Sequence, residues 1–357
     1  MVSDWMTIEN VLTELGKHPR LLAEAELEPI QGTRFQPTGF PDIGAAEYDA
    51  PDGTKMLLVE STQSMANRME MVCWDNTTNG FVEPLRGLPF IAVVDEKGRP
   101  LTNSILEAHR INSAYIIGAK NSEIDKKLKE QFGGATFREK ERRELARFLF
   151  EYDTCSLLHG VFLPKHGGGR CRITRTLSAF VEASNVNQAV SGGVKLDSID
   201  TGKDSNDKEK RASEEGRGYI VYPKIEYTGE LKAYFNVDLA EIRGFGLGEK
   251  AEKLLEALAL FKIQKLLAEG LRLRSACDLR LVSLNVKAPA GFVMPSKEEL
   301  SEALPILIDS CKKEGLFKGS PSVTETYTGS KKKGKKEENE SDMAQESEDG
   351  AGDEEDG

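Results

Sequence analysis

Four residues of types that bind metal ions lie close together in the middle of the sequence: Cys155, His159, His166 and Cys171. A structural zinc site needs four such ligands at about 2.0–2.3 Å from one ion. Segments 157–163 and 170–176 flank the turn-forming residues PKHGGG, which predicts a hairpin with Cys171 opposite Phe162. Cys155 would then lie seven residues further along the strand, roughly 23 Å away at about 3.3 Å per residue. The hairpin and the zinc site exclude each other, so we predict no metal ion and no cofactor.

The segment RCRITRTLSAFVE (170–182) offers chemistry of another kind. Its alternation predicts a strand with one apolar face, into which Arg175 intrudes, and one polar face. The polar face carries Arg170, Arg172, Thr174, Thr176, Ser178 and Phe180. Four basic residues and no acidic residue lie between Asp153 and Glu182. Arginines, hydroxyls and an aromatic ring on a sheet face suit RNA phosphates, 2′-hydroxyls and bases, although an ordinary solvated sheet face explains the pattern equally well.

Two smaller polar groups are candidates for the same interface. The helix predicted after KMLLVE, with Ser61 as its N-cap, carries Gln63, Ser64, Asn67 and Arg68, which could hold a phosphate or a sugar edge. A plain helix surface is the alternative. The pair His109-Arg110 admits either RNA binding or ribonuclease chemistry. The sequence contains no P-loop, no G-x-S-x-G and no H-E-x-x-H, so no enzyme class is indicated.

The elements that must position these residues alternate irregularly along the chain. Apolar periodicity predicts helices at 8–15, 61–71, 102–116, 121–149, 249–269 and 296–312. It predicts strands at 22–30, 55–60, 90–94, 157–163, 170–182 and 279–286, and a hairpin of 219–227 with 231–238 around Thr228-Gly229. Interleaved helices and strands with hairpins indicate an α+β fold, with an antiparallel sheet backed by helices.

Charge divides the chain into a body and a tail. The formal net charge is −11, but residues 337–357 hold eleven acids and no base, which leaves 48 basic and 48 acidic residues in the remainder. We predict a folded body at 1–318, containing a mobile loop at about 198–218, and a disordered Lys-then-acidic tail at 319–357. The five scattered cysteines favour reduced thiols, and no apolar run is long enough to span a membrane, so a cytoplasmic location is expected.

Several motifs recur in this order in one protein family. They are RFQPTGFPDIGAAEY, LLVESTQSMANRMEM, LEAHRINSAYI, LLHGVF, SAFVEASNV with GGVKLD, and LRLRSACDL, spanning roughly residues 20–285. The chain thereby resembles the backbone RAMP subunit, the Cascade "seven"-type protein, of type I-G (formerly I-U) CRISPR effector complexes, which serve antiviral defence. The acidic tail departs from the family pattern.

The resemblance implies a fold and a function. It implies an RRM-like (ferredoxin-like) palm with finger insertions and a thumb, for which 198–218 supplies the tip. It also implies a non-catalytic subunit that forms a helical oligomer along the CRISPR RNA (crRNA) with the other type I-G subunits, while base pairing reads the target DNA. Arg34, His159 and Lys195 lie in the matching segments and join the candidate RNA-binding residues. The alternative is an endoribonuclease of the same superfamily, with Asp197 or Asp200 as the thumb aspartate.

Overall fold

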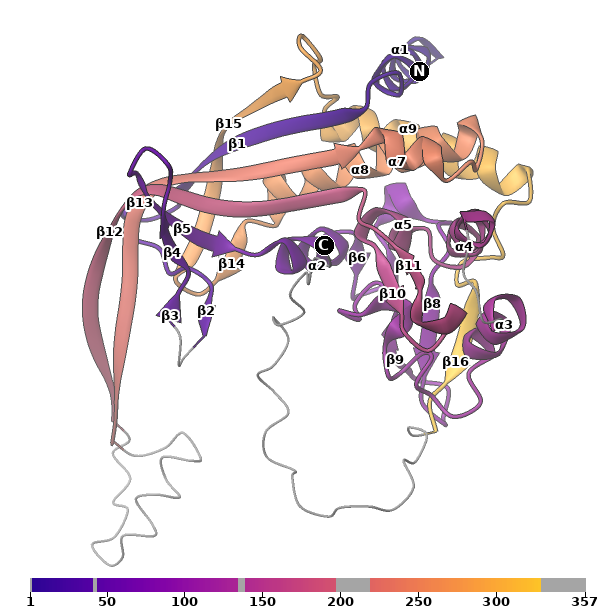
Figure 1. Ribbon diagram of the computed structural model, residues 1–357, viewed down its shortest axis with the longest axis horizontal. Helices are drawn as coiled ribbons and strands as arrows, with labels where there is room; N and C mark the ends of the chain where they lie inside the picture. The colour runs from indigo at the N-terminus through magenta and orange to yellow at the C-terminus, as the bar shows by residue number, and fades with distance from the viewer. Residues whose placement is uncertain (1, 41–43, 134–138, 197–218, 329–357) are drawn as a thin grey trace, which may run out of the picture.

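The computed structural model describes residues 2–40, 44–133, 139–196 and 219–328, and its largest element is a seven-stranded sheet (Figure 1). Its strands are β1 (Arg20–Pro29), β4 (Glu47–Asp49), β5 (Lys55–Glu60), β12 (Leu177–Leu196), β13 (Tyr219–Asp238), β14 (Arg272–Arg274) and β15 (Cys277–Ala288). Their spatial order is β14-β15-β1-β13-β12-β5-β4, and every neighbouring pair is antiparallel. Together with the helices, this sheet confirms the expected α+β class.

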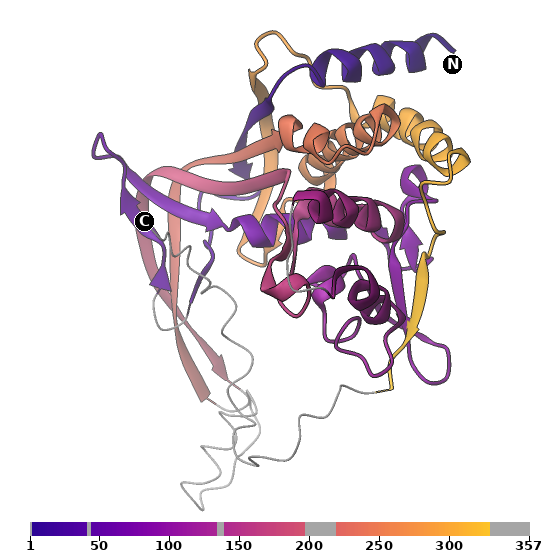
Figure 2. The ribbon, with the colours of Figure 1, turned by 45° about the vertical axis from the view of Figure 1, so that its right-hand side comes forward.

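Alternation along the central strands gives the sheet one buried face and one open face. The buried positions of β1 are Leu21, Ala23, Ala25 and Leu27, and those of β13 nearest to it are Leu231, Ala233, Phe235 and Val237. Helices α2 (Thr62–Met71) and α8 (Glu249–Glu269) pack against this sheet and help to close the core (Figure 2). The intervening residues of β1 and β13 are half-buried or exposed, so the opposite face of the sheet lies open to solvent.

The other helices surround this core. They are α1 (Val2–Leu15), α3 (Glu123–Phe132), α4 (Glu139–Tyr152), α5 (Cys155–His159), α7 (Leu239–Gly244) and α9 (Lys297–Lys313). The predicted helix 249–269 is confirmed as α8 with the same bounds. The predicted N-cap Ser61 accepts a hydrogen bond from the backbone N–H of Ser64 at 3.3 Å, as expected for the start of α2. In the described part of the chain, no helix has the length and apolar composition needed to cross a bilayer.

Strands β12 and β13 form a long arm. They pair from Leu177↔Val237 to Leu196↔Tyr219, whereas their outer neighbours pair only with the inner halves, so the outer halves project beyond the sheet (Figure 1). The predicted hairpin at Thr228-Gly229 is therefore wrong, because β13 is continuous there. A Cβ on Gly229 would lie 2.8 Å from the carbonyl oxygen of Ser184, so this glycine permits close strand approach beside a bulge. The predicted loop 198–218 lies outside the described residues.

The helix predicted at 102–116 does not form: its first two residues end a strand of a smaller three-stranded sheet, and the rest are turns and a short 3-10 helix. This sheet contains β8 (Ile91–Val94), β9 (Pro100–Asn103) and β16 (Val323–Thr326), in the order β16-β8-β9. The side chain of Asn103 accepts bonds from the N–H groups of Ile105 and Leu106, and Arg110 has a φ of 50°; both features are incompatible with a continuous helix. Because β16 pairs with β8, the folded body continues beyond the predicted boundary at residue 318.

The segment that contains Cys155, His159, His166 and Cys171 folds into a short helix followed by a hairpin. Residues 155–159 form α5 instead of the start of the predicted strand, and Gly160, with a φ of 79°, ends the helix. The hairpin consists of β10 (Val161–Leu163) and β11 (Cys171–Ile173). Cys171 pairs with Leu163, one residue away from the predicted partner Phe162. The remaining short elements are β2 (Gly39–Phe40), β3 (Gly44–Ala45), β6 (Trp74–Asp75), β7 (Gly80–Phe81), η1 (Glu83–Leu85), η2 (Arg110–Asn112) and η3 (Gly167–Gly169).

Candidate nucleic-acid interface

The β10–β11 hairpin presents two exposed arginines of the predicted set, Arg170 and Arg172. Cys171 and Ile173 face the core, so the intervening Arg172 faces solvent. Arg170 is exposed as well, and neither arginine forms an ion pair within the described residues. Arg172 lies directly opposite Phe162, whose side chain is 51% exposed. A guanidinium paired across strands with an exposed ring can bind a phosphate and stack on a base.

The single polar strand face predicted at 170–182 is divided between two sheets. Strand β11 ends at Ile173, and β12 begins at Leu177 in the large sheet. Thr176 is buried, because its hydroxyl donates to the carbonyl oxygen of Leu157 at 3.0 Å. Ser178 lies on the open face of the large sheet, half-buried. The predicted face is therefore wrong as one surface, and its two arginines belong to the hairpin alone.

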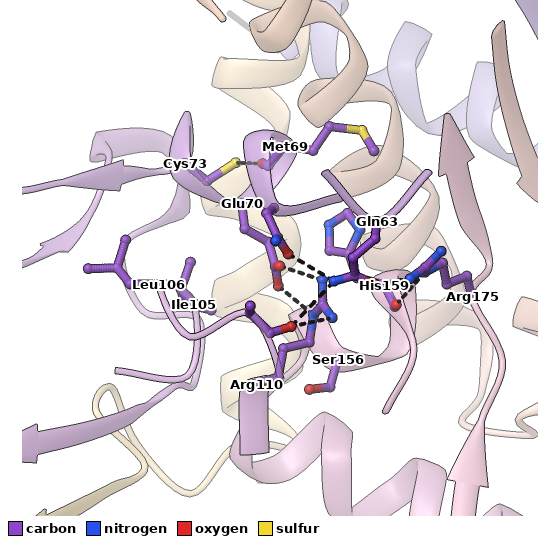
Figure 3. A network of polar contacts seen from close by, with 12 residues as sticks. Gln63, Met69, Glu70, Cys73, Ile105, Leu106, Arg110, Ser156, His159 and Arg175 are labelled. Atoms are coloured by element: carbon purple, nitrogen blue, oxygen red, sulfur yellow. Dashed lines mark hydrogen bonds and ion pairs between the residues drawn. The ribbon is translucent and has the colours of Figure 1, made fainter. Parts of the chain in front are cut away.

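Arg175 enters the protein between these two strands, as the alternation indicates. Its Nε donates to the carbonyl oxygen of His159 at 3.2 Å, and its guanidinium also donates to the Gln63 side-chain oxygen (Figure 3). The Gln63 amide group donates in turn to Asn67 at 3.1 Å. Gln63 and Asn67 are half-buried and hold Arg175 and each other, so their first role is to join α2 to the segment before β12.

Arg110 belongs to the core. Its side chain forms a bidentate pair with Glu70, with Nε–Oε1 and Nη2–Oε2 distances of 3.0 and 2.6 Å (Figure 3). Arg110 is only 4% exposed and Glu70 only 1%. Removing either partner would leave a buried charge uncompensated, which makes the pair a structural element. We therefore leave Arg110 out of the RNA-contacting surface.

His159 is also buried and contacts Lys262 of α8. The Lys262 Nζ and His159 Nε2 atoms are 2.9 Å apart, and both side chains are almost completely buried. Burial, followed by the positive charge of Lys262, holds the pKa of His159 well below its ordinary value. The imidazole is therefore neutral and accepts from the lysine. Burial also raises the pKa of nearby Asp153 to about 6.

The remaining predicted residues lie in separate places. Arg68 donates to the carbonyl oxygens of Arg272 and Leu273 and is 3.6 Å from Glu60, so it ties α2 to β14. Arg34 is half exposed at the base of the arm, with its guanidinium 3.1 Å from Glu226. The other three are Ser64, which is half-buried on α2, His109, which is exposed before η2, and Lys195, which pairs with Ile220 in the arm and whose side chain is outside the described part.

The side chains of Cys155, His159, His166 and Cys171 do not converge on one point. His166 Nε2 lies 3.1 Å from Asp125, whereas His159 contacts Lys262, and Cys155 and Cys171 are buried free thiols. Within the described residues, no three His, Cys, Asp or Glu side chains are grouped so as to hold a metal ion. Asp197 and Asp200, the aspartates of the ribonuclease alternative, lie outside the described residues.

Two features of this region were missed in the sequence. Lys165, exposed in the turn of the hairpin, adds a third cation beside Arg170 and Arg172, and Phe162 adds the ring. The alternation of buried and exposed positions along the hairpin could have identified them, if the two strands had been paired one residue away from the predicted register. Lys262 was the second omission, although it stands between Phe261 and Ile263 on the apolar side of α8.

The hairpin lies in the part of the chain that matches a family of CRISPR-associated proteins. A family described as CRISPR-associated protein GSU0053 matches residues 21–188. A chain of a solved structure described as "CRISPR RNA-guided surveillance complex, pre-nicking" is 13% identical, with 75% of each chain covered and a TM-score of 0.38. Csc2 from Thermofilum pendens is 9% identical, with 84% of this chain and 78% of that chain covered and a TM-score of 0.29. No curated protein matches. The family match runs from β1 into β12 and includes the hairpin.

Proposed function

We propose that this protein is a non-catalytic, guide-RNA-binding backbone subunit of a type I-G CRISPR interference complex. The observation that carries the proposal is the CRISPR-associated family match over residues 21–188. The motif order from RFQPTGFPDIGAAEY to LRLRSACDL supports the backbone subunit in particular. On this proposal several copies line one crRNA in the cytoplasm, with the other subunits of the complex, and base pairing selects the target DNA.

The strand connectivity supports an RRM-like palm. Strands β1, β12, β13 and β15 follow in the chain and lie in the order β15-β1-β13-β12, with α2 before β12 and α8 between β13 and β15. That is the arrangement of a split β-α-β-β-α-β unit. The projecting outer halves of β12 and β13 supply the proposed thumb, and the insertions between β1 and β12 supply the fingers.

The β10–β11 hairpin is the proposed RNA contact. Lys165, Arg170 and Arg172 provide cations for the phosphates, and Phe162 provides a stacking surface. Arg34 at the base of the arm, Lys195 along the arm and His109 before η2 remain candidates. Buried Arg110 and His159, together with Gln63 and Asn67, then act by positioning the elements that carry the hairpin. Arg68 acts in the same way on β14.

The test is co-expression with a CRISPR array carrying one defined spacer. We expect the purified particle to contain several protein copies and one crRNA, by light scattering and by gel analysis of the extracted nucleic acid. A monomer free of RNA would refute the proposal. The non-catalytic part is tested by adding labelled complementary RNA and Mg²⁺ to the particle: cleavage at regular intervals, lost in Asp197→Ala or Asp200→Ala, would show an endoribonuclease instead.

A further inference from the structure

The open face of the large sheet differs in chemistry from the β10–β11 hairpin. Six carboxylates of β1, β12 and β13 lie on it, and they are Glu24, Glu26, Glu28, Glu182, Glu230 and Asp238. Arg20, Arg280, Lys232 and Lys287 pair with Asp238, Glu28 and Glu24. Glu26, Glu182 and Glu230 form no ion pair within the described residues, and their hydrogen bonds come from Ser283, Tyr48 and Asn185. Lys232 stands opposite both Glu26 and Glu182 in the sheet, but its ammonium group pairs with Glu24.

These three carboxylates surround one depression of the face. A pocket of about 400 Å³ is lined by Glu26, Glu28, Glu182 and Glu230, by Lys232 and Tyr234, and by apolar side chains that include Met56 and Val282. Glu28 pairs with Arg280 and Lys232 pairs with Glu24, so Glu26, Glu182 and Glu230, which are unpaired in the described part of the chain, give the pocket a net negative charge. Val282 is 54% exposed, so the pocket also offers apolar surface to a partner.

Aromatic rings form part of the same face. Phe180 and Tyr234 stack across β12 and β13, with ring centroids 4.9 Å apart and planes 20° from parallel. The Lys232 Nζ lies 6.0 Å from the Tyr234 ring centroid and 3.1 Å from Glu24. One ammonium group is therefore already held here by a carboxylate and a ring, which is the arrangement that a further cationic side chain would use.

We propose that this open sheet face binds an extended basic segment of a partner protein, with an arginine or lysine side chain in the pocket between Glu26, Glu182 and Glu230. Charge complementarity selects the partner, because uncompensated carboxylates attract guanidinium and ammonium groups and repel the phosphates of a nucleic acid. The exposed apolar side chains and the aromatic stack favour a polypeptide over a free inorganic cation. This surface is separate from the hairpin, so the inference does not depend on the proposed RNA contact.

The probe is a fluorescein-labelled nine-residue peptide of alternating arginine and serine, measured by fluorescence anisotropy with the full chain. Glu26→Gln/Glu182→Gln/Glu230→Gln should weaken its binding at least tenfold. The matched control is Glu96→Gln/Glu298→Gln/Glu302→Gln, which removes the same charge from exposed positions elsewhere and should change the affinity less than twofold. The acidic tail contributes equally to all three proteins. Tyr234→Leu, which keeps apolar bulk but removes the ring, should weaken binding several-fold while melting near the wild-type temperature.

Three results would overturn the inference. Equal peptide affinity of the two triple variants would show that only overall charge matters. Weaker binding of a labelled ten-nucleotide RNA by the sheet variant would make this face an RNA surface. Tighter peptide binding after changing the five lysines of 331–336 to glutamine in the full chain would identify the occupant as this chain's own lysine run. Failure of the RNA proposal leaves all three measurements interpretable, because the hairpin residues are unchanged in every variant.

Discussion

Arg110 and Arg172 are the same residue type in opposite environments. Arg110 lies in the core, where Glu70 binds it through two hydrogen bonds, and Arg175 and Lys262 contribute further charge to the same network. Arg172 lies on a hairpin strand whose other face is buried, and it points into solvent opposite Phe162. Sequence motifs mark both arginines as candidates for RNA binding. Their neighbours separate them: the first arginine has a buried carboxylate as its partner, and the second has none in the described part of the chain.

Removing Arg110 should have the largest effect on stability. In Arg110→Ala the Glu70 carboxylate stays buried without its bidentate partner, so we expect a loss of about 3–5 kcal/mol in the free energy of unfolding. Denaturation followed by circular dichroism measures the loss. Arg99→Ala is the matched control, because Arg99 pairs with Asp95 on the surface and should be dispensable. Equally small losses in the free energy of unfolding of both variants would contradict a structural role for the buried Arg110–Glu70 pair.

Glu256 is a buried acidic residue without a partner in the described part of the chain, and it therefore contrasts with the paired Arg110. It is buried on α8 next to Gly16 and forms no hydrogen bond or ion pair within the described residues. Burial, with a smaller contribution from Glu252, raises the pKa of Glu256 to about 8. The folded protein therefore retains this proton above pH 4.5, where the unfolded chain releases it, and the free energy of unfolding falls as the pH rises from about 4.5 to about 8.

Glu256→Gln should remove that decline, because glutamine has no proton to lose. We expect no stabilisation at pH 4 and a gain on the order of 4 kcal/mol at pH 8. Urea titrations at both pH values measure the change, with Glu302→Gln on the exposed side of α9 as the control. A gain that is independent of pH would mean that packing, and not ionisation, accounts for the effect.

Arg175→Ala should have an intermediate effect. The change removes the bonds to the His159 carbonyl oxygen and to Gln63, and it leaves a gap at the segment that joins β11 to β12. We expect a loss of about 1–2 kcal/mol in the free energy of unfolding, from thermal and urea denaturation. Gln63→Ala in the Arg175→Ala background tests the coupling: additive losses would show that the two side chains act independently.

The sequence predicted elements well where local signals were complete. Helix α8 has its predicted bounds, because an apolar face is followed directly by Gly270. At 102–116 the same apolar periodicity misled, since Arg110 takes a positive φ that is supported by its bond to Glu70, forty residues earlier in the chain. Likewise Thr228-Gly229 has the composition of a turn, and only the approach of Ser184 shows why glycine stands inside a continuous strand. These outcomes depend on tertiary contacts that a local pattern does not contain.

The candidate site was predictable to a similar extent. Alternation identified Arg170 and Arg172 as exposed and Arg175 as turned inward. It could not show that the polar face breaks at Thr176, because that hydroxyl is satisfied by Leu157 in a helix that was predicted to be a strand. The charges along any single strand did not reveal the acidic open face. Glu26, Glu182 and Glu230 come together only when β1, β12 and β13 pair in the sheet.

Arg172→Ala tests the exposed half of the comparison. It should melt at the wild-type temperature and bind guide RNA more weakly, with the slope of log affinity against log salt reduced by about one per subunit. Filter binding at several salt concentrations measures the slope, and scrambling the spacer should change the affinity little.

Phe162→Ala should instead lower the RNA affinity without changing the salt slope, because a stacking contact releases no counterion. Early melting of Arg172→Ala with normal RNA binding once folded would contradict the hairpin as the RNA contact, and the contact would then be sought around Arg34 and His109.

The smallest effect is expected from the tail. Residues 331–357 carry five lysines and eleven acids, a net charge of −6, and lie outside the described part of the chain. Removing them should leave the melting temperature unchanged, because this segment has almost no apolar content with which to pack. Affinity for nonspecific RNA should rise by about twofold at low salt and not at all at high salt, since the tail acts on the exposed arginines only through a screened field. An RNA affinity gain that persists in high salt would instead indicate direct contact between the tail and the hairpin, and Arg170→Ala/Arg172→Ala in the shortened chain would then abolish that gain.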